Sequence, residues 1–464
     1  MRLTILFIFA LTLVYGQSQW PHGKITTVPD GHHLQYEDGT PFFWLGDTAW
    51  ELFHRLNRDE IKYYLDNRKA KSFTVIQSVI LAEFEGLTKP NQEDQLPLLD
   101  NDPLKPNEKY FSIVDYTLDQ ALERGMVMGL LPTWGDKVAK MWGVGPEVFN
   151  ETNALSYGKW LGTRYKKYPN IIWILGGDRI PQNDKNDWRP IWRAMALGIE
   201  SGYGKNAAIS YHISGGQKTT SQFLHKEGWL DINMMQSGHG SGHDVPVWEW
   251  IEKDYQLTPA KPTLDSEPNY EDHPVNPWPI YDPVNGYFND YDVRKQCYRS
   301  VFAGACGVTY GHHSMWQFWS AREEKVNNAL LYWTDAIDRP GAFQVGYLRW
   351  LVESRPFQQS VPAQDLIQEV GEKGEHIQGL KAKDGSYALI YLPVGKTVSV
   401  NTRLLSGKEL RYWWFNPRNG TSRLGSVTLK TSSMKFTPPT LGIGEDWVLV
   451  IDDVSKNFVV PGSH

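Results

Sequence analysis

Short apolar segments and amphipathic segments alternate along most of this chain, and no other sequence feature restricts the possible folds as much. From about residue 41 the spacing is roughly 30 residues, the length of one strand, one helix and their loops. Eight parallel strands, each followed by a helix, predict a (β/α)8 or TIM barrel over residues 25–355. The predicted strands are residues 42–45, 73–79, 126–131, 171–175, 207–211, 231–235, 262–264 and 307–310.

The alternative for these residues is an open, doubly wound α/β sheet, which is built from the same alternating elements. Such a sheet commonly carries a glycine-rich phosphate-binding loop after its first strand. The first predicted strand is instead followed by Gly46-Asp47-Thr48-Ala49-Trp50, which is not a phosphate loop. The barrel is therefore the preferred prediction.

The pattern changes after residues 355–363, whose sequence Arg-Pro-Phe-Gln-Gln-Ser-Val-Pro-Ala is typical of a linker. Beyond it the apolar residues recur with a period of two, as in residues 387–392, 411–415 and 447–451. Asp384-Gly385 and Asn419-Gly420 are hairpin-turn signals between such segments. We therefore predict a small all-β sandwich domain over residues 362–464.

The first 16 residues have the composition of a secretory signal peptide. Arg2 precedes an apolar run from Leu3 to Val14, and Gly16 supplies a small residue at the cleavage point. The run is too short to span a membrane, which takes about 20 residues. No cysteine lies near the cleavage point for lipid attachment, so we expect a secreted or periplasmic protein without a membrane span.

The overall composition excludes some classes of partner. A formal net charge of -6 with 22% charged residues leaves no basic surface for nucleic acid. The chain has 20 Trp and 23 Tyr, whose rings fill cores but also stack on the C–H faces of sugars. We expect an oligosaccharide or polysaccharide substrate and no cofactor, and the working expectation for the oligomeric state is a monomer.

Two predicted strands end in carboxylates. The apolar run 171–175 is followed by Gly176, Gly177 and Asp178, and the short run 262–264 is followed closely by Glu267. The glycines allow a sharp turn and the close approach of a ligand to the backbone. The simpler alternative for Asp178 is a helix cap or a pair with Arg179.

Polar and aromatic residues follow all eight predicted strands. Active sites of TIM barrels lie at the C-terminal ends of the strands, so these residues are candidates for contact with substrate. Acids, histidines and indoles around one rim suit a neutral ligand with many hydroxyls, such as a sugar. The candidate substrate-binding residues are Asp47, Trp50, Glu83, Trp134, His212, His239, Tyr270, His312 and Trp316.

Cleavage of a glycosidic bond needs one carboxylic acid and one carboxylate, and Asp178 and Glu267 can supply them. Strands four and seven lie nearly opposite in an eight-stranded barrel, so we expect Asp178 to be the acid/base and Glu267 the nucleophile of a retaining enzyme. Asp265 competes with Glu267 for its role, because residues two apart on an extended chain face the same side, which would turn both inward. Asp47 and Glu83 compete with Asp178.

The histidines also allow a metal site to be considered. His239 and His243 have a four-residue spacing, which places two ligands on one face of a helix. Gly240 and Gly242 argue against a helix there, so we predict no metal and expect hydrogen bonds from His212, His239 and His312 to sugar hydroxyls. Structural histidines in packed loops are the alternative for each of them.

Three motifs resemble those of glycoside hydrolase family 140, the apiosidase-like catalytic domain of gut Bacteroides and related bacteria. They are Phe42-Phe-Trp-Leu-Gly-Asp-Thr-Ala-Trp50, Trp173-Ile-Leu-Gly-Gly-Asp178 and Asp265-Ser-Glu-Pro-Asn-Tyr-Glu271. The tail, with residues 412–420 and 447–450, is similar to a β-sandwich labelled a collagen-binding domain, which in such enzymes more often packs on the barrel.

The resemblance implies a (β/α)8 barrel that removes apiose linked to galacturonic acid in the pectin rhamnogalacturonan II. It places the acid/base on Asp178 and the nucleophile on Glu267. The wider clan of retaining barrel hydrolases has Asn-Glu at the end of strand four, whereas this chain has Gly177-Asp178. We therefore expect a secreted, exo-acting glycosidase. The alternatives are a barrel glycosidase for another plant or host glycan and a carbohydrate-binding protein without catalysis.

Overall fold

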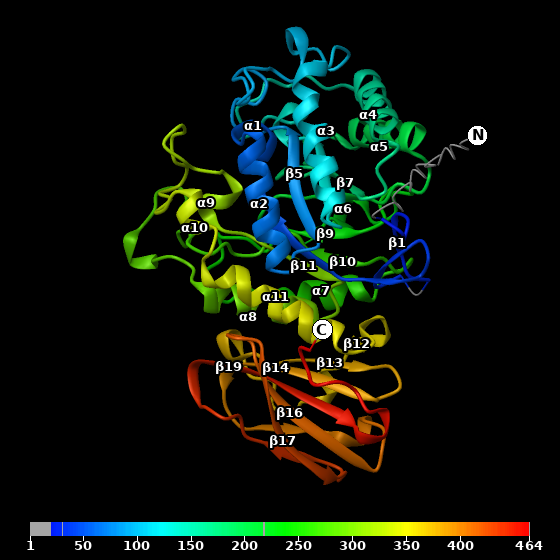
Figure 1. Ribbon diagram of the computed structural model, residues 1–464, viewed down its shortest axis with the longest axis vertical. Helices are drawn as coiled ribbons and strands as arrows, with labels where there is room; N and C mark the ends of the chain where they lie inside the picture. Colours follow the sequence, from blue (N-terminus) through cyan, green and yellow to red (C-terminus); the bar gives the residue numbers. More distant parts are fainter. Residues whose placement is uncertain (1–19, 30, 217–218, 464) are drawn as a thin grey trace, which may run out of the picture.

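The computed structural model describes residues 20–29, 31–216 and 219–463 (Figure 1). The predicted signal peptide, residues 1–16, lies outside the described residues. Within them, no helix combines the length and the apolarity that a membrane span requires.

Eight parallel strands form the predicted barrel. They are hydrogen-bonded in the order β8-β7-β6-β5-β4-β11-β10-β9, and a parallel bridge between Ser210 and Ile232 joins β8 to β9. This confirms the TIM barrel. The strands are β4 (Trp44–Thr48), β5 (Val75–Leu81), β6 (Val127–Thr133), β7 (Ile171–Gly176), β8 (Ile209–His212), β9 (Asn233–Met235), β10 (Thr263–Asp265) and β11 (Gly307–Tyr310).

Each of the eight predicted strands coincides with an observed one, but the ends differ by one or a few residues. At the first predicted strand the difference has a structural reason. Pro41–Phe42 forms a separate strand, β3, in a small antiparallel sheet with β1 (Ile25–Thr27) and β2 (Leu34–Tyr36). Side chains from this sheet join the apolar cluster inside the barrel, so the sheet covers part of the barrel interior. No periodicity in the sequence had indicated it.

Helices surround the barrel, and several begin at residues suited to it. Asn57 accepts a hydrogen bond from the Glu60 backbone while the Glu60 side chain accepts one from the Asn57 backbone, a capping box at the start of α2. The helices are α1 (Leu52–Arg55), α2 (Arg58–Ala70), α3 (Glu108–Glu123), α4 (Glu151–Tyr165), α5 (Arg189–Tyr203), α6 (Ser221–Leu224), α7 (Val247–Tyr255), α8 (Asp290–Phe302), α9 (His313–Trp316), α10 (Trp333–Ala336) and α11 (Pro340–Glu353).

The alternation of side chains along β4 shows how the barrel separates inside from outside. Trp44 joins the interior cluster and donates a hydrogen bond from Nε1 to Thr309 Oγ1 of β11 (3.0 Å). Leu45, one residue later, joins the cluster between strands and helices. Because successive residues of a strand point to opposite faces, Asp47 also points outward, toward α2.

The C-terminal region is the predicted all-β domain. A six-stranded antiparallel sheet has the order β12-β13-β14-β19-β16-β17, and the pair β15-β18 forms a second layer. Sixteen buried residues, among them Ile390, Trp414 and Leu449, form the domain's own core. The strands are β12 (Ser360–Pro362), β13 (Gln378–Ala382), β14 (Tyr387–Gly395), β15 (Val398–Val400), β16 (Glu409–Asn416), β17 (Thr421–Leu429), β18 (Met434–Phe436) and β19 (Gly442–Asp453).

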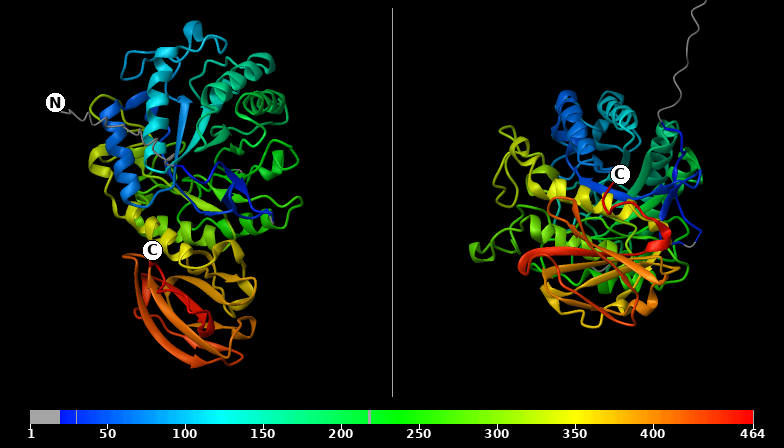
Figure 2. Two further views of the ribbon diagram at one scale, coloured as in Figure 1. Left: turned by 45° about the vertical axis from the view of Figure 1, so that its right-hand side comes forward. Right: turned by 60° about the horizontal axis from the view of Figure 1, so that its bottom comes forward.

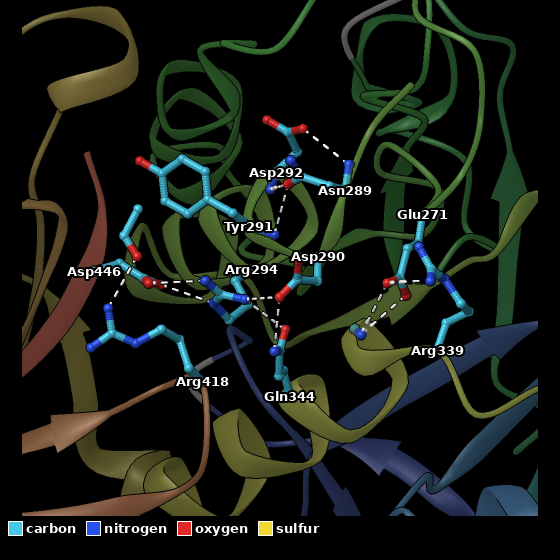
Figure 3. A network of polar contacts seen from close by, with 12 residues as sticks. Glu271, Asn289, Asp290, Tyr291, Asp292, Arg294, Arg339, Gln344, Arg418 and Asp446 are labelled. Atoms are coloured by element: carbon cyan, nitrogen blue, oxygen red, sulfur yellow. Dashed lines mark hydrogen bonds and ion pairs between the residues drawn. The ribbon is translucent and has the colours of Figure 1, made fainter. Parts of the chain in front are cut away.

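The outer face of the large sheet packs on the barrel, against α8 and α11 (Figures 1 and 2). Tyr391 of β14 stacks on Tyr298 of α8 with ring centroids 4.9 Å apart. Arg294 of α8 donates from Nε and from a terminal nitrogen to Asp446 of β19 (3.1 and 3.0 Å), as Figure 3 shows. β14 is consequently buried on both faces, which explains its continuous apolar sequence.

Candidate active site

A cavity of about 570 Å³ opens among the loops that follow the C-terminal ends of the barrel strands. It lies where the barrel fold places active sites. Eight of the eleven predicted catalytic and substrate-binding residues line it, together with loop residues that carry no such prediction. The predicted residues in its wall are Trp50, Glu83, Trp134, Asp178, His239, Glu267, Tyr270 and Trp316.

Three side-chain nitrogen atoms surround the Glu267 carboxylate. His212 Nε2 lies 2.9 Å from one carboxylate oxygen, and His239 Nε2 and Gln236 Nε2 lie 3.2 and 3.0 Å from the other. Burial alone would raise the pKa of Glu267, but the hydrogen bonds from His212 and His239 outweigh it and lower that pKa to about 2. Glu267 is therefore an ionised carboxylate at neutral pH.

The backbone fixes which nitrogen of each histidine carries the proton. The N–H of Asp178 donates to Nδ1 of His212 (3.2 Å), and the N–H of Tyr270 donates to Nδ1 of His239 (3.4 Å). An amide can only donate, so both Nδ1 atoms are acceptors and the proton of each neutral ring is on Nε2. Both Nε2 atoms lie within 3.2 Å of the Glu267 carboxylate, and His212 contacts the backbone of one candidate carboxyl residue and the side chain of the other.

Asp178 has a different environment. Its backbone has a φ of 52°, in the left-handed region that non-glycine residues rarely occupy, just after two glycines with positive φ. Its side chain accepts long hydrogen bonds from Trp142 Nε1 (3.2 Å), the Gly215 N–H (3.4 Å) and Arg179 (3.4 Å), so the pair with Arg179 is present but long. Burial and then the charge of Glu267 raise its pKa to about 6. Asp178 can thus hold a proton that Glu267 cannot.

Glu83 is a third carboxyl group in the cavity wall. Among the residues that the structure describes, its side chain has no hydrogen-bond or ion-pair partner. Burial and the charge of Asp178 raise its pKa to about 8, so it is protonated at neutral pH. A neutral carboxyl group facing a cavity can donate a hydrogen bond to a ligand oxygen.

Aromatic side chains form much of the inner wall. Trp50 and Trp134 lie with ring centroids 5.3 Å apart, and Trp50 also contacts the His212 ring edge-on at 5.2 Å. Tyr270 packs on His239 at 4.3 Å. Burial and the charge of Glu267 hold the pKa of the Tyr270 hydroxyl well above its usual value, so that hydroxyl remains a donor. Such a wall offers apolar faces with a few polar groups, as sugar sites do.

Three predicted residues do not line the cavity. His212 lies beneath it, fully buried, and touches Glu267 rather than open space. Asp47 points outward along β4 and pairs with Arg68 Nε at 2.5 Å while accepting a hydrogen bond from the Tyr64 hydroxyl, both in α2. His312 is the N-cap of α9 and pairs with Asp272 at 3.0 Å. Asp47 and His312 thus have structural partners.

Asp265 also faces away from the cavity, which corrects the expectation that it alternates inward with Glu267. Its carboxylate accepts hydrogen bonds from Ser237 Oγ (2.9 and 2.8 Å) and Ser300 Oγ of α8 (2.8 Å). β10 ends at Asp265, so the period of two does not continue to Glu267.

His239 and His243 contact different carboxylates. His243 Nδ1 lies 3.0 Å from Asp292, away from the Glu267 that His239 contacts. Over residues 20–29, 31–216 and 219–463, no group of three or more His, Cys, Asp or Glu residues is arranged to hold a metal ion.

The sequence also matches known families. Residues 28–359 match the model described as "Apiosidase-like, catalytic domain". The chain belongs to this apiosidase-like family. Residues 361–452 match the model described as "Putative collagen-binding domain of a collagenase". None of the curated proteins matches the chain significantly.

Solved structures agree with the family. One, named a glycoside hydrolase, is 33% identical with a TM-score of 0.86, and the match covers 96% of this chain and 100% of that one. Another, named a glycoside hydrolase family 5 protein from Bacteroides vulgatus ATCC 8482, is 31% identical with a TM-score of 0.86, and the match covers 96% of each chain. The apiosidase-like chain is a glycoside hydrolase with a barrel fold.

Several residues in the wall of this apiosidase-like cavity were not predicted. Trp142, Trp278, His273 and Phe84 lie on loops some distance after a strand rather than directly after it. Their only sequence signal is an aromatic residue in a loop rich in glycine or proline, as in Trp142-Gly143 and Pro277-Trp278-Pro279. Gln236, directly after β9, lies in the wall and donates to Glu267, although a glutamine at a strand end predicts no particular role.

Proposed function

We propose that this glycoside hydrolase is an exo-acting, retaining apiosidase, secreted or periplasmic, that releases apiose from rhamnogalacturonan II side chains. The observation that carries the proposal is a single cavity with two carboxyl groups in different protonation states. Asp178, with its raised pKa, suits an acid, and Glu267, with its lowered pKa, suits a nucleophile. The apiosidase-like family supports the choice of sugar.

The proposed reaction has two steps. Glu267 attacks the anomeric carbon while Asp178 gives its proton to the leaving oxygen, so the glycosidic bond breaks and a glycosyl ester forms on Glu267. Asp178, now ionised, then takes a proton from water as the water attacks the anomeric carbon and releases Glu267. His212, His239 and Gln236 orient the Glu267 carboxylate throughout.

A pocket with a buried inner wall supports action on a terminal sugar. Trp50, Trp134 and Tyr270 are at most 3% exposed and lie at the inner part of the cavity wall. A cavity of about 570 Å³ is large enough for a monosaccharide and part of its neighbour. These features favour removal of one end unit over cleavage inside a chain.

The test is product analysis on rhamnogalacturonan II oligosaccharides with the wild type, Glu267→Gln and Asp178→Asn. We expect free apiose from the wild type and none from the variants. NMR of the first product should show the anomeric configuration of the substrate. Release by either variant would place the chemistry on other residues. No release by the wild type would direct the search to another glycan with the same two carboxyl groups.

A carbohydrate-binding protein without catalysis is the second candidate. It would use the same aromatic wall, and Glu267→Gln would then leave its affinity for glycans unchanged with no turnover by the wild type on any glycan. The distinct protonation states of the two carboxyl groups favour the enzyme, because binding alone does not need them.

We further propose that the C-terminal domain stabilises the barrel rather than binding substrate. Its large sheet buries one face against α8 and α11, with the Arg294–Asp446 pair inside the interface. Truncation near residue 356 should lower the melting temperature or the solubility of the barrel. A stable truncated barrel with weaker glycan binding would instead identify a binding module.

A further inference from the structure

Two tryptophans differ from all the others in this chain. Of the 20 tryptophans, all of which lie in the described ranges, only Trp142 and Trp278 are exposed, with 61% and 55% of their surface open. Both line the active-site cavity. Exposing an indole costs free energy of burial, so two exposed indoles at one cavity mouth indicate a surface that a ligand covers.

Trp142 is fixed in place on one side only. The guanidinium carbon of Arg179 lies 4.2 Å from its ring centroid, and Arg179 itself is fully buried. Arg179 is held by the backbone oxygens of Ala139, Lys140 and Asp178. One face of the indole thus rests on a rigid cation, and its exposed surface remains for a ligand. A ring that is already fixed loses little conformational entropy on binding.

Trp142 also touches the candidate acid. Its Nε1–H donates to Oδ2 of Asp178 (3.2 Å), while the Gly215 N–H donates to Oδ1. An acid that protonates a leaving oxygen must lie beside that oxygen, and the leaving group extends beyond it. An aromatic ring that is hydrogen-bonded to the acid therefore lies on the leaving-group side of the bond that breaks.

We propose that Trp142 is the platform for the first sugar ring of the leaving group, an inference that rests on the function proposed above. The ligand is a sugar whose C–H face covers the open indole surface, linked through the oxygen that Asp178 protonates. The site thus recognises two units, the terminal sugar inside the cavity and its neighbour on Trp142. Trp142 has a second role as a positioning residue, because its N–H orients the Asp178 carboxyl group.

The two roles can be separated by substitution. Trp142→Phe keeps an aromatic ring but removes the N–H, whereas Trp142→Ala removes both. Two substrates carry the same terminal sugar: apiose-bearing rhamnogalacturonan II oligosaccharides, and methyl apioside, whose leaving group has no ring. Tyr63→Ala is the matched control, since Tyr63 is an exposed ring (49%) on α2 outside the cavity.

On the oligosaccharide we expect Trp142→Ala to have a kcat/KM at least about tenfold below that of Trp142→Phe, mostly through KM. On methyl apioside the two variants should agree within about twofold. Both should also show the alkaline limb of the pH profile at higher pH than the wild type, because a hydrogen bond to ionised Asp178 has been lost. An equal ratio of the two variants on both substrates would overturn the platform and leave the N–H role alone.

Failure of the proposed function is distinguishable from failure of the platform. If the wild type hydrolyses neither substrate, the apiosidase proposal fails by itself. The platform is then read from acrylamide quenching of tryptophan fluorescence in Glu267→Gln with added pectin oligosaccharides. The platform is supported if the oligosaccharide protects the fluorescence from acrylamide in Glu267→Gln but not in the double variant Glu267→Gln/Trp142→Phe. No protection by any pectin oligosaccharide overturns it.

Discussion

The interface between the two domains and the active-site cavity both contain buried ionisable groups, but these groups are fully hydrogen-bonded at the interface, whereas two of them are poorly hydrogen-bonded in the cavity. At the interface, Arg294 and Asp446 are 2% and 0% exposed, and Asp446 accepts two hydrogen bonds from Arg294 and a third from the Tyr391 hydroxyl (3.0 Å). In the cavity, Asp178 has only long contacts to its carboxylate, from Trp142, the Gly215 N–H and Arg179 (3.2–3.4 Å), and Glu83 has no side-chain partner among the described residues.

The contrast separates structural from catalytic use of charge. A buried pair with matched donors keeps both groups ionised and inert. A buried carboxyl group whose charged partner is absent, or only a long contact, keeps its proton, because desolvation of the charged form then outweighs the attraction. Glu267 stands between these cases, since its three donors keep it ionised without a cation that would block it. The fold thus has three environments for carboxyl groups, and each suits a different role.

The largest effect should come from Glu267→Gln. Removal of the nucleophile should lower kcat by a factor on the order of 10⁴ or more. Steady-state release of sugar from the oligosaccharide measures it. Glu85→Gln is the control, because Glu85 is exposed on the same rim but outside the cavity wall. A comparable loss in both variants would contradict a specific role for Glu267.

Asp446→Asn tests the other side of the comparison. It removes one of the two carboxylates that pair with the buried Arg294 guanidinium and leaves only Asp290, at 2.6 Å, which should lower the free energy of unfolding by about 1–3 kcal/mol. Chemical denaturation measures this loss, and the folded variant should keep its kcat. Glu375→Gln is the control, because it removes an exposed pair with Lys396 (3.0 Å) in the same domain and should change stability little. Equal effects of the two variants would refute a structural role for the buried pair.

Asp178→Asn should make the protein more stable at neutral pH while it abolishes activity. The folded-state pKa of Asp178 is about 6, above the unfolded value of about 4. The folded state therefore binds more protons between these values, and wild-type stability falls as pH rises through this window. The stability of the asparagine variant does not fall in this way, because asparagine does not titrate. We expect melting temperatures that agree near pH 4 and separate above pH 6 in favour of the variant; a lower melting temperature for the variant at pH 7 would count against a strained, proton-holding Asp178.

Glu83→Gln should have the smallest effect. Glu83 is neutral below pH 8, so glutamine replaces one neutral hydrogen-bonding group with another, and kcat/KM at pH 5–7 should change by less than about fivefold. Glu83→Ala should lose more, because the donor to the ligand disappears. If Glu83→Gln is as inactive as Asp178→Asn, then Glu83 rather than Asp178 is the acid.

The sequence predicted the barrel well because its signal is periodic. Buried parallel strands have continuous apolar runs, and the helices between them repeat at a regular spacing, so all eight strands could be placed. The N-terminal sheet β1–β3 was missed because its strands have two or three residues each and show no period. The sequence also did not predict that the outer face of β14 is buried against the barrel, since that burial depends on packing between domains.

The candidate site was predicted in part, and the errors have a common cause. Residues directly after a strand were treated as facing the cavity, but side-chain direction depends on where each strand ends. β4 continues to Thr48, so Asp47 is still inside the strand and points to α2. Trp142 and Trp278 reach the cavity from long loops, whose course no local sequence pattern specifies. The hydrogen bonds that distinguish Asp178 from Glu267 likewise exist only in the folded chain.

The pH dependence of kcat/KM tests the central claim most directly, because it reports the protonation of Asp178 and Glu267 in the free enzyme. The two groups interact, so the limbs belong to the pair. With rhamnogalacturonan II oligosaccharides as substrate, we predict a level from about pH 3 to 5 and a fall of about tenfold per pH unit above pH 6, as Asp178 loses its proton. A profile that stays level through pH 8 would contradict the assignment of Asp178 as the acid.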